Sequence, residues 1–462
     1  MKYLGGIAII IIFLLSSCRK DLEIDRSSDL ALNFSTDTVF FDTVFTTIGS
    51  TTKRFKIYNR SNRAIEISKI DLPEQTAFAK YRLNVDGLSG NHLRNIEIPA
   101  NDSIFAFVEI SIDPNLSNMP FVVEDSIVFE TNGNIQDVSV LAYGQNARFY
   151  RDSVITGTVT WTKDLPYVIF GGILIDSLSR LSIDAGCKIY LHKDAIIYAK
   201  GTLEVNGTLN DSVTFQGDRR EIQYYNEPGQ WNAIQFLPGS VNNKINYACI
   251  KGSVFGIISG TIPTYGIRPD VTVSNSVIKY SQVTGMFGLA GEIKAYNNLI
   301  FACGQYGVLT QYGGNYEFIH NTIALTNFDF SRDNSAVAFT DFIRVNNTPF
   351  SNPLSVNFQA NIVTGTEQDE YLVELLNTSS AVITENNLLK TTQNWPASNF
   401  KNLNPQFKDP SLSLNQNFTE NYRLKDGSPA RARIPQISNP AVLLQDADGI
   451  VRGNPSSIGC YE

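Results

Sequence analysis

One short motif recurs down the C-terminal half of this chain: an Asn followed by two strand-forming residues. It occurs at Asn298-Leu299-Ile300, Asn321-Thr322-Ile323, Asn361-Ile362-Val363 and Asn387-Leu388-Leu389, with weaker copies at Ser276-Val277-Ile278 and Ala248-Cys249-Ile250. From position 276 onward, successive copies are 22, 23, 40 and 26 residues apart. Spacing of this length indicates a stacked repeat, and the residue types indicate that each repeat unit is built from β-strands.

Stacking decides where the residues of this motif must lie. One coil cannot bury its apolar side chains alone, so we expect the last motif residues to form an interior ladder: Ile278, Ile300, Ile323, Val363 and Leu389. We expect the Asn residues to form a second, structural column that hydrogen-bonds along the stack and supports left-handed bends between strands. His320 precedes Asn321 and is predicted to be a bend residue, not a general base.

The first 17 residues read as a targeting segment. The apolar run from Leu4 to Leu15 is shorter than the roughly 20 residues that span a bilayer. It ends at Leu15-Ser16-Ser17-Cys18, which resembles a bacterial lipobox with Cys18 as the lipidated residue. The alternative is an ordinary signal peptide with an incidental Cys.

Residues 18–29 are expected to be a lipid-anchored tether, because charged residues crowd this stretch. The segment Cys18-Arg19-Lys20-Asp21-Leu22-Glu23 resembles the surface-export signal of lipoproteins in Bacteroidota. This resemblance implies an outer-membrane protein that is anchored through Cys18 and faces the cell surface. The periplasmic leaflet is the alternative location.

Composition narrows the possible partners. The net charge is −8 and no run of Lys or Arg is longer than two, which argues against nucleic-acid binding. Besides Cys18, the cysteines are widely spaced and are expected to be buried free thiols: Cys187, Cys249, Cys303 and Cys460. No zinc-binding spacing of Cys or His occurs, so we expect neither a metal nor a cofactor.

Residues 30–148 alternate apolar and polar side chains, as in Ile104-x-Ala106-x-Val108-x-Ile110, which indicates half-buried strands. The stretches KRFKIYNRSNRAIEISKI, DSIVFETNG and VSVLAYGQ resemble an immunoglobulin-like β-sandwich of the major-sperm-protein type. This resemblance covers about a quarter of the chain and implies a spacer or adhesion module.

Residues 149–434 contain short strands broken by Gly, as in LSIDAGCKIYLHKDAIIYAKGTLEVNGTLNDSVTFQG. Together with the Asn-headed repeats, this segment resembles the right-handed parallel β-helix of the pectate-lyase-like class. The fold class we predict is therefore all-β, with a sandwich followed by this solenoid.

Residues 435–462 resemble the terminal capping segment of exported bacterial β-helix proteins. The residues that match its pattern are Asp448, Gly449, Arg452, Gly453, Ile458, Gly459, Tyr461 and Glu462. Arg431 stands where that pattern has Asp, so this turn is expected to differ. Open solenoid ends need covers, and we expect the sandwich at one end and the 435–462 segment at the other.

Catalytic signatures of β-helix enzymes are missing from the sequence. Polygalacturonases need paired Asp carboxylates, a Gly-His-Gly and an Arg-x-Lys, and none of these motifs is present. Pectate lyases need several carboxylates around Ca²⁺ and a basic residue that takes a proton, yet no acidic column recurs at the coil spacing. We assign no catalytic residue.

Two segments carry the residue types of a sugar site. The longer spacing between Asn321 and Asn361 predicts an insertion with candidate ligands Phe328, Asp329, Arg332, Asp333, Asp341 and Arg344. REIQYYNEPGQW offers Tyr224, Tyr225 and Trp231 for stacking on sugar rings. Either segment could instead be an ordinary loop, and AVAF and FIRV in the insertion could form an extra coil.

These inferences point to a cell-envelope lipoprotein without catalytic activity. Its β-helix would serve surface adhesion or bind glycans or another envelope component, and its partners would be the membrane and a polysaccharide or an envelope protein. The alternative is a polysaccharide lyase or glycoside hydrolase that acts on an acidic polysaccharide, an option that the fold supports by analogy alone.

Overall fold

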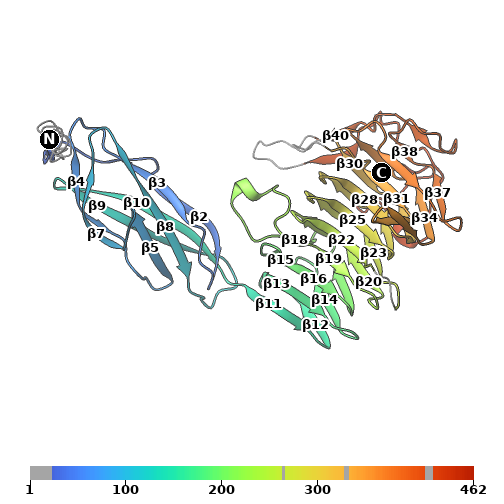
Figure 1. Cartoon of the computed structure of the whole chain (residues 1–462), viewed down its shortest axis with the longest axis horizontal. Helices are drawn as coiled ribbons and strands as arrows, with labels where there is room; N and C mark the ends of the chain where they lie inside the picture. The colour runs from blue at the N-terminus through green and yellow to red at the C-terminus, as the bar shows by residue number, and fades with distance from the viewer. Residues whose placement is uncertain (1–22, 263–265, 327–331, 411–419) are drawn as a thin grey trace, which may run out of the picture. The chain divides into compact units, whose positions relative to one another are not determined.

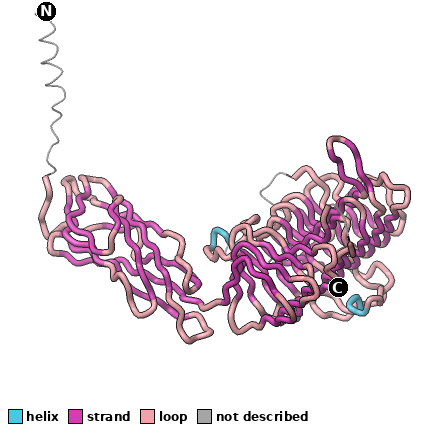
Figure 2. Tube along the Cα trace, turned by 60° about the horizontal axis from the view of Figure 1, so that its bottom comes forward, coloured by secondary structure: helices cyan, strands magenta, loops and turns pink. Residues whose placement is uncertain are grey.

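The computed structural model describes residues 23–262, 266–326, 332–410 and 420–462, and this part of the chain is all-β (Figure 1). Its helical segments are two short 3-10 turns, η1 (Ile222–Tyr224) and η2 (Ala441–Leu444) (Figure 2). No helix in these ranges is long and apolar enough to cross a membrane. The chain forms two compact units that divide between Asn146 and Ala147, two residues before the boundary expected from the sequence.

The N-terminal unit contains two five-stranded sheets that share one hydrophobic core. The first sheet consists of β1 (Asn33–Phe34), β3 (Lys53–Tyr58), β8 (Ser103–Ile112), β5 (Ala79–Val85) and β6 (Leu88–Ser89). The second consists of β2 (Thr38–Phe45), β10 (Asn134–Gln145), β9 (Phe121–Thr131), β4 (Ile65–Asp71) and β7 (His92–Ile98). Every second residue of β8 is buried from Ile104 to Ile112, as the alternation predicted.

The second unit contains long parallel sheets that are consistent with a β-helix, and we call it the parallel stack. It begins with β11 (Arg148–Ile155) and β13 (Tyr167–Ile175) and then separates into lanes of parallel strands. Lane A contains β15 (Lys188–Leu191), β18 (Val213–Gly217), β21 (Ala248–Lys251), β24 (Val277–Lys279), β27 (Leu299–Phe301), β30 (Thr322–Leu325), β35 (Ile362–Gly365), β38 (Leu388–Leu389) and β39 (Phe400–Lys401).

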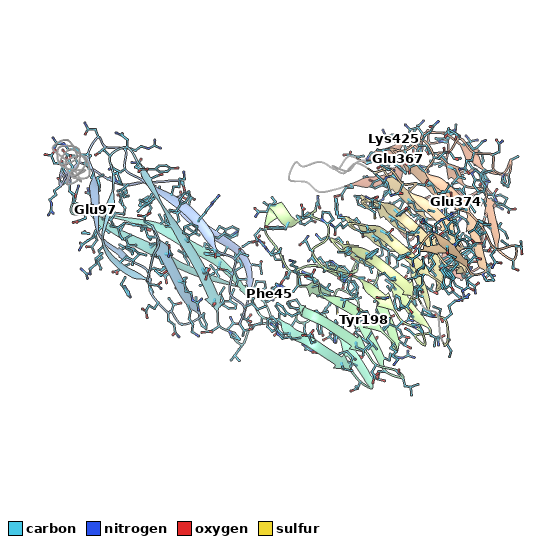
Figure 3. The ribbon with its side chains drawn as sticks, in the orientation of Figure 1. Phe45, Glu97, Tyr198, Glu367, Glu374 and Lys425 are labelled. Atoms are coloured by element: carbon cyan, nitrogen blue, oxygen red, sulfur yellow. The ribbon has the colours of Figure 1, made fainter. Side chains whose placement is uncertain are left out.

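Two further lanes complete each coil. Lane B contains β16 (Ile196–Ala199), β19 (Ile234–Phe236), β22 (Phe255–Gly260), β25 (Thr284–Leu289), β28 (Tyr306–Gln311), β31 (Val337–Thr340) and β36 (Tyr371–Glu374). Lane C contains β12 (Thr158–Trp161), β14 (Arg180–Asp184), β17 (Thr202–Asn206), β20 (Asn243–Asn246), β23 (Asp270–Ser274), β26 (Glu292–Tyr296), β29 (Gly314–Ile319), β34 (Leu354–Gln359) and β37 (Ala381–Glu385). Figure 3 labels Tyr198 of β16 and shows the side chains along these strands.

The predicted interior ladder is confirmed. Ile278 pairs with Ile300, Ile300 with Ile323, Ile323 with Val363 and Val363 with Leu389, and all five are fully buried. Each coil therefore contributes one apolar side chain to a continuous core that no single coil could form.

The Asn column is a hydrogen-bonded ladder inside the stack. The side-chain oxygen of each Asn accepts from the backbone N–H and from the side-chain amide of the Asn one coil earlier. The amide-to-oxygen distances are 2.9 Å from Asn298 to Asn321, 3.0 Å from Asn321 to Asn361, 3.1 Å from Asn361 to Asn387 and 3.0 Å from Asn387 to Asn399. The predicted structural role is confirmed, and the ladder extends one step further, to Asn399.

The left-handed bends lie one residue before the ladder, not on it. Asn297, His320, Ala360 and Asn386 have φ values of 56°, 57°, 57° and 59°. His320 is therefore a bend residue, as predicted. The ladder Asn residues supply the hydrogen bonds between coils, whereas the residue before each of them adopts the left-handed backbone conformation.

The segment between Asn321 and Asn361 contributes one strand to the parallel stack and also contains a hairpin that projects from it. Its strand β31 pairs with β28 and β36 in lane B, so AVAF belongs to a coil. FIRV forms β32 (Phe342–Val345), which pairs with β33 (Thr348–Ser351) in an antiparallel hairpin outside the parallel sheets. The alternative of an extra coil is therefore right for AVAF, whereas FIRV lies in a part that projects from the stack.

The C-terminal segment packs on the side of the stack and does not cover its end. Residues of lane A, including Leu299 and Ile362, share a hydrophobic cluster with residues of the tail, including Ile434 and Ile458. The cluster also includes residues of β40 (Phe407–Asp409) and β41 (Asn421–Leu424), so this covering begins before position 435. At the end of the stack, the ring centroid of Trp395 lies 4.9 Å from that of Tyr371.

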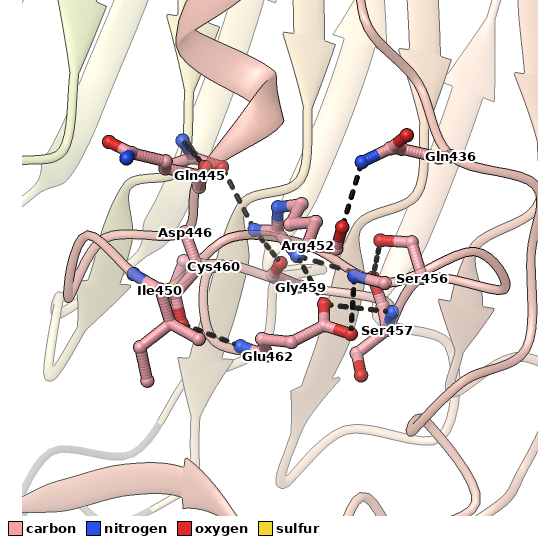
Figure 4. Close-up of polar contacts among 12 residues, drawn as sticks. Gln436, Gln445, Asp446, Ile450, Arg452, Ser456, Ser457, Gly459, Cys460 and Glu462 are labelled. Carbon is pink, nitrogen blue, oxygen red and sulfur yellow. Dashed lines mark hydrogen bonds and ion pairs between the residues drawn. The ribbon is translucent and has the colours of Figure 1, made fainter.

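Polar contacts join residues of the tail around Arg452 (Figure 4), and further contacts hold the tail against the stack. The Arg452 guanidinium, 2% exposed, donates to Asn297 Oδ1 at 2.9 Å and to the Gly459 carbonyl at 2.9 Å. The backbone N–H of Cys460 donates to Thr322 Oγ1 at 3.1 Å. The residues that suggested a capping segment thus bind a lateral face, because the outward side chains of lane A are apolar there.

Candidate functional site

The outward face of lane A changes character along the stack. Where the tail covers it, the outward residues are apolar, as with Leu299, Phe301 and Ile362. Nearer the start of the stack, where no residue of 420–462 lines the cavity described below, the outward residues become polar and basic. The register places these outward residues side by side in the uncovered part: Tyr190, Thr214, Gln216, Cys249, Lys251 and Lys279.

These residues form the floor of a cavity of about 430 Å³, which we call the Lys251 pocket. This volume lies within the range of small-ligand sites, about 300–1,000 Å³. One wall is the segment between β18 and β19, which leaves the coil at Gly217 and returns at Trp231. This wall contributes Arg219, Arg220, Tyr224, Tyr225 and Gln230.

The wall segment is fastened to the corner of the stack. The side-chain amide of Gln230 donates to the carbonyls of Tyr224 at 2.8 Å and of Glu227 at 2.7 Å. A Cβ on Gly217 would lie 2.2 Å from Gln230 Oε1, so only glycine allows this close packing. The wall residues are therefore held in place by the scaffold.

Cations and tyrosine rings alternate around the pocket. The Lys251 ammonium lies 3.6 Å from the centroid of the Tyr225 ring, and the Arg219 guanidinium lies 4.0 Å from that of Tyr224. Arg220 lies 5.1 Å from the Tyr190 ring centroid and donates to its hydroxyl at 2.6 Å. Each ring holds a cation through its π-face, which keeps long basic side chains ordered.

The pocket has an excess of positive charge. Arg219 pairs with Glu221 at 3.1 Å, and Lys279 pairs with Glu420 at 3.2 Å. The other three basic lining residues have no carboxylate within 4.0 Å in the described part of the chain: Lys188, Arg220 and Lys251. A protein with a net charge of −8 thus concentrates unpaired cations at one small site.

Lys251 has the most perturbed basic group of the pocket. It is 8% exposed, and burial, together with the charges of Lys279 and Arg220, lowers the pKa of its amine to about 8. Burial and like charge both disfavour the ammonium form. An anion in the pocket would relieve both effects, because it would supply the missing counter-charge.

The predicted aromatic residues separate in the structure. Tyr224 and Tyr225 line the pocket, but Trp231 is fully buried in the core of the stack. Its indole N–H donates to the carbonyl of Lys251 at 2.8 Å. Trp231 therefore supports the strand that carries Lys251 and cannot stack on a ligand, which corrects its assignment as a ligand residue.

The residues predicted in the 321–361 segment do not form a site. Arg332 and Glu370 make a buried bidentate pair, with distances of 2.8 Å and 2.6 Å. Asp341 is also buried and accepts from the backbone N–H groups of Leu376 and Asn377, both at 2.8 Å. Both assignments as ligand residues are therefore corrected: these charged groups satisfy buried partners of the scaffold.

The remaining candidates of that segment are scattered. Asp333 is exposed, and Arg344 lies on the hairpin, 5.2 Å from the Phe342 ring centroid. Phe328 and Asp329 lie outside the described residues, as does Cys18. Their roles stay predictions.

Sequence reasoning missed the basic residues of the pocket, although a signal was present. Lys251 and Lys279 are 28 residues apart and each directly follows an apolar motif copy, so they occupy the same position in consecutive coils. Arg219 and Arg220 form one of the short basic pairs of the sequence and directly precede the REIQYYNEPGQW tyrosines. The four cysteines are free thiols, and Cys249 is partly exposed on the pocket floor instead of buried.

Comparisons with known proteins add little. No protein-family model and no curated protein matches the chain. Similar solved structures include a protein of unknown function from Porphyromonas gingivalis W83 (TM-score 0.18, 9% identity, 27% of this chain and 60% of that one). Another is a family 123 glycoside hydrolase from Clostridium perfringens, described for glycolipid glycan hydrolysis (TM-score 0.18, 8% identity, 28% and 30% coverage). The matches span less than two thirds of either structure, and likeness this weak supports no functional argument.

In the described ranges, no group of three or more His, Cys, Asp or Glu side chains is arranged to hold a metal ion. The Lys251 pocket combines cations and tyrosine rings on one concave surface, and it is the strongest candidate for a ligand site.

Proposed function

We propose that this protein binds an acidic glycan in the Lys251 pocket. The observation that carries the proposal is the set of three basic side chains that have no carboxylate within 4.0 Å among the described residues, next to the partly exposed Tyr224 and the exposed Tyr225, on one small concave surface. Carboxylate and sulfate groups on a sugar satisfy ammonium and guanidinium donors, and the apolar faces of sugar rings pack on tyrosine.

The wider setting of the proposal follows from the sequence. We propose that the protein is an exported lipoprotein, which is anchored at Cys18 to the outer membrane and faces the outside of the cell. Its N-terminal unit would be an immunoglobulin-like spacer, and the parallel stack a right-handed β-helix that displays the pocket. A binding role agrees with the missing catalytic motifs and with a pocket built from basic and aromatic residues.

The test is a titration of the purified full-length chain with polygalacturonate, with an uncharged polysaccharide as the reference ligand. We expect binding of polygalacturonate alone, weakening as salt is raised because the contacts are ionic. Lys251→Met keeps the shape of the side chain and should reduce affinity about 10- to 100-fold, from a lost charge-assisted bond of about 1.5–3 kcal/mol.

Lys244→Met is the matched control, since Lys244 is an exposed lysine of β20 in lane C, away from the pocket. It should leave affinity unchanged. If both variants bind polygalacturonate as the parent chain does, the pocket is not the binding site.

Lys251 also favours a second candidate function, β-elimination of an acidic polysaccharide. An amine with a pKa of about 8 is partly in the free-base form near neutral pH and can take a proton. In this reaction the amine removes the proton next to a uronate carboxylate, the C4–O bond breaks, a C4–C5 double bond forms, and the departing oxygen takes a proton. Arg220 and Lys279 would stabilise the negative charge that develops on the carboxylate.

Ultraviolet absorbance of the unsaturated product tests this candidate directly. If the protein is a lyase, absorbance should rise with time and be abolished in Lys251→Met. A flat trace with a bound ligand would leave the protein a binder and exclude this chemistry for the tested polymer.

A further inference from the structure

We infer that the Lys251 pocket receives the end of an acidic glycan chain, not an internal stretch of it. The inference rests on the proposed function and adds to it the part of the ligand that is recognised. It follows from the described residues that close the pocket in the direction along the stack and in the direction across it.

The tail closes the pocket at one end of lane A. The outward position after Lys279 in the register is Phe301, which is 1% exposed and lies 4.8 Å from the Tyr422 ring, centroid to centroid. In the parallel column, Val277 is followed by Leu299, which is covered by the same cluster. A sugar chain that ran along the stack in this direction would meet the packed tail.

Arg220 closes the opposite end of the Tyr190 column. Its guanidinium lies over the Tyr190 ring and donates to the hydroxyl, and Tyr190 is only 2% exposed. A chain that followed this column could not continue past Arg220 without breaking that bond.

The third boundary is the wall segment. The Tyr225 ring lies directly against the Lys251 ammonium, and the Gln230 amide fixes the segment to the carbonyl of Tyr224. On the opposite side the lining residues are Lys188 and Ser212, which are exposed, and Thr214 and Cys249, which are partly exposed. A chain can therefore enter beside Lys188, but it has no exit across the pocket.

A ligand in this setting presents its terminal residue to Lys251 and leaves the rest of the chain beside Lys188. The terminal residue must carry an anionic group, either a uronate carboxylate or a sulfate ester, because Arg220 and Lys251, which have no carboxylate within 4.0 Å among the described residues, both line the closed part of the pocket. Both groups accept hydrogen bonds from ammonium and guanidinium donors.

The inference is tested by measuring how the unmodified full-length protein binds polysaccharide samples of equal mass and different chain length. Polygalacturonate is compared with the same mass cut about tenfold in length, and a sulfated oligosaccharide series forms the second arm. End recognition predicts that the amount of protein bound per gram rises about tenfold on cutting, in proportion to the number of ends. The arm with the higher affinity identifies the carboxylate or the sulfate.

Chemical modification of one end completes the experiment. Reduction of the reducing end changes that end alone, so loss of binding would assign recognition to the reducing end and unchanged binding would assign it to the non-reducing end. Equal binding per gram before and after cutting would overturn the inference while the proposed function stands. No binding of any acidic chain, long or short, would instead overturn the proposed function itself.

Discussion

At the scale of single residues, Lys251 and Asn321 show how the same scaffold treats polar groups in opposite ways. Asn321 is buried with all its partners in place, because both its oxygen and its amide are matched by the neighbouring coils. Lys251 is nearly buried with no carboxylate beside it among the described residues, although a tyrosine ring holds it in place. A satisfied buried group serves stability, and an unsatisfied one at a pocket indicates a ligand.

The amine of Lys251 gives binding a defined pH dependence. Its pKa is lowered to about 8, so the positive charge is lost as pH rises through 8, well below the ordinary range of lysine. We expect the affinity for polygalacturonate to fall between about pH 7 and pH 9, and this fall to be absent in Lys251→Met. Elimination would show the opposite sign, because the free amine is the base. The measurement is a titration across this pH range, with product absorbance followed in parallel.

Asn321→Leu should destabilise the parallel stack by about 1–3 kcal/mol, since it leaves the backbone N–H of Asn298 and the carbonyl of Ala295 without their partners. Thermal unfolding followed by circular dichroism measures the loss. Asn210→Leu is the control at an exposed position, and its melting temperature should match the parent chain. Equal melting temperatures for both variants would contradict a structural ladder.

At the scale of elements, the stack separates strands that belong to coils from strands that project. The β32–β33 hairpin has both edges unpaired with any other strand in the described structure, and its ends meet, since Asn352 N donates to Asp341 O at 2.9 Å. The neighbouring β31 lies between two strands of lane B and contributes Val337 and Phe339 to the core.

We expect the hairpin to be dispensable for folding and the strand before it to be essential. Replacing residues 342–351 with Asn-Gly, which closes a tight turn, should leave the circular-dichroism spectrum and melting temperature nearly unchanged. Extending the replacement back to residue 333 removes β31 and should unfold the second unit. Equal stability of the two deletions would show that β31 is not part of the scaffold.

At the scale of the whole molecule, the tail packs on the outward face of lane A and so decides which residues of this face reach the surface. It covers the apolar outward residues of lane A and reaches Lys279 through Glu420, so it both stabilises the stack and forms one boundary of the Lys251 pocket. His320 lies fully buried next to this contact, close to the backbone of Gly459 in the tail. Burial first, and the charge of Arg452 second, place the pKa of His320 well below its ordinary value.

Acidification should therefore weaken the tail contact. His320 stays neutral when folded but takes a proton at about pH 6.5 when unfolded, so the unfolded chain binds more protons below this pH. Stability is unaffected above pH 6.5 and falls as pH decreases below it, by no more than about 1.4 kcal/mol per pH unit from this group. Chemical denaturation at several pH values measures the fall, and His320→Asn, which tolerates the left-handed bend, should reduce it.

Much of the architecture could be predicted from the sequence, because its causes are local and periodic. The repeat spacing predicted the interior ladder of Ile278 and its partners, the hydrogen-bonded Asn column and the bend at His320. Alternation predicted the half-buried strands of the first unit. These features depend on which residues can share a face, and that is visible in the spacing of the chain.

The candidate site could be predicted only in part. Tyr224 and Tyr225 were recognised from their residue type, but Trp231, Arg332 and Asp341 have the same polar or aromatic character and are buried. Residue type alone does not distinguish a ligand contact from a buried support. The difference depends on whether partners such as Glu370 reach the same place, and these come from distant positions.

The all-β repeat and the faces of its strands could be derived from the sequence alone, since burial of alternate residues and coil-to-coil pairing follow from the periodicity. The tertiary structure alone decided which part of the outward face stays open. The tail packs on the apolar part of lane A, where it buries hydrophobic side chains and gains free energy. Packing over Lys251 would instead require the desolvation of basic side chains, which costs free energy. The pocket is thus the part of lane A that this packing leaves uncovered.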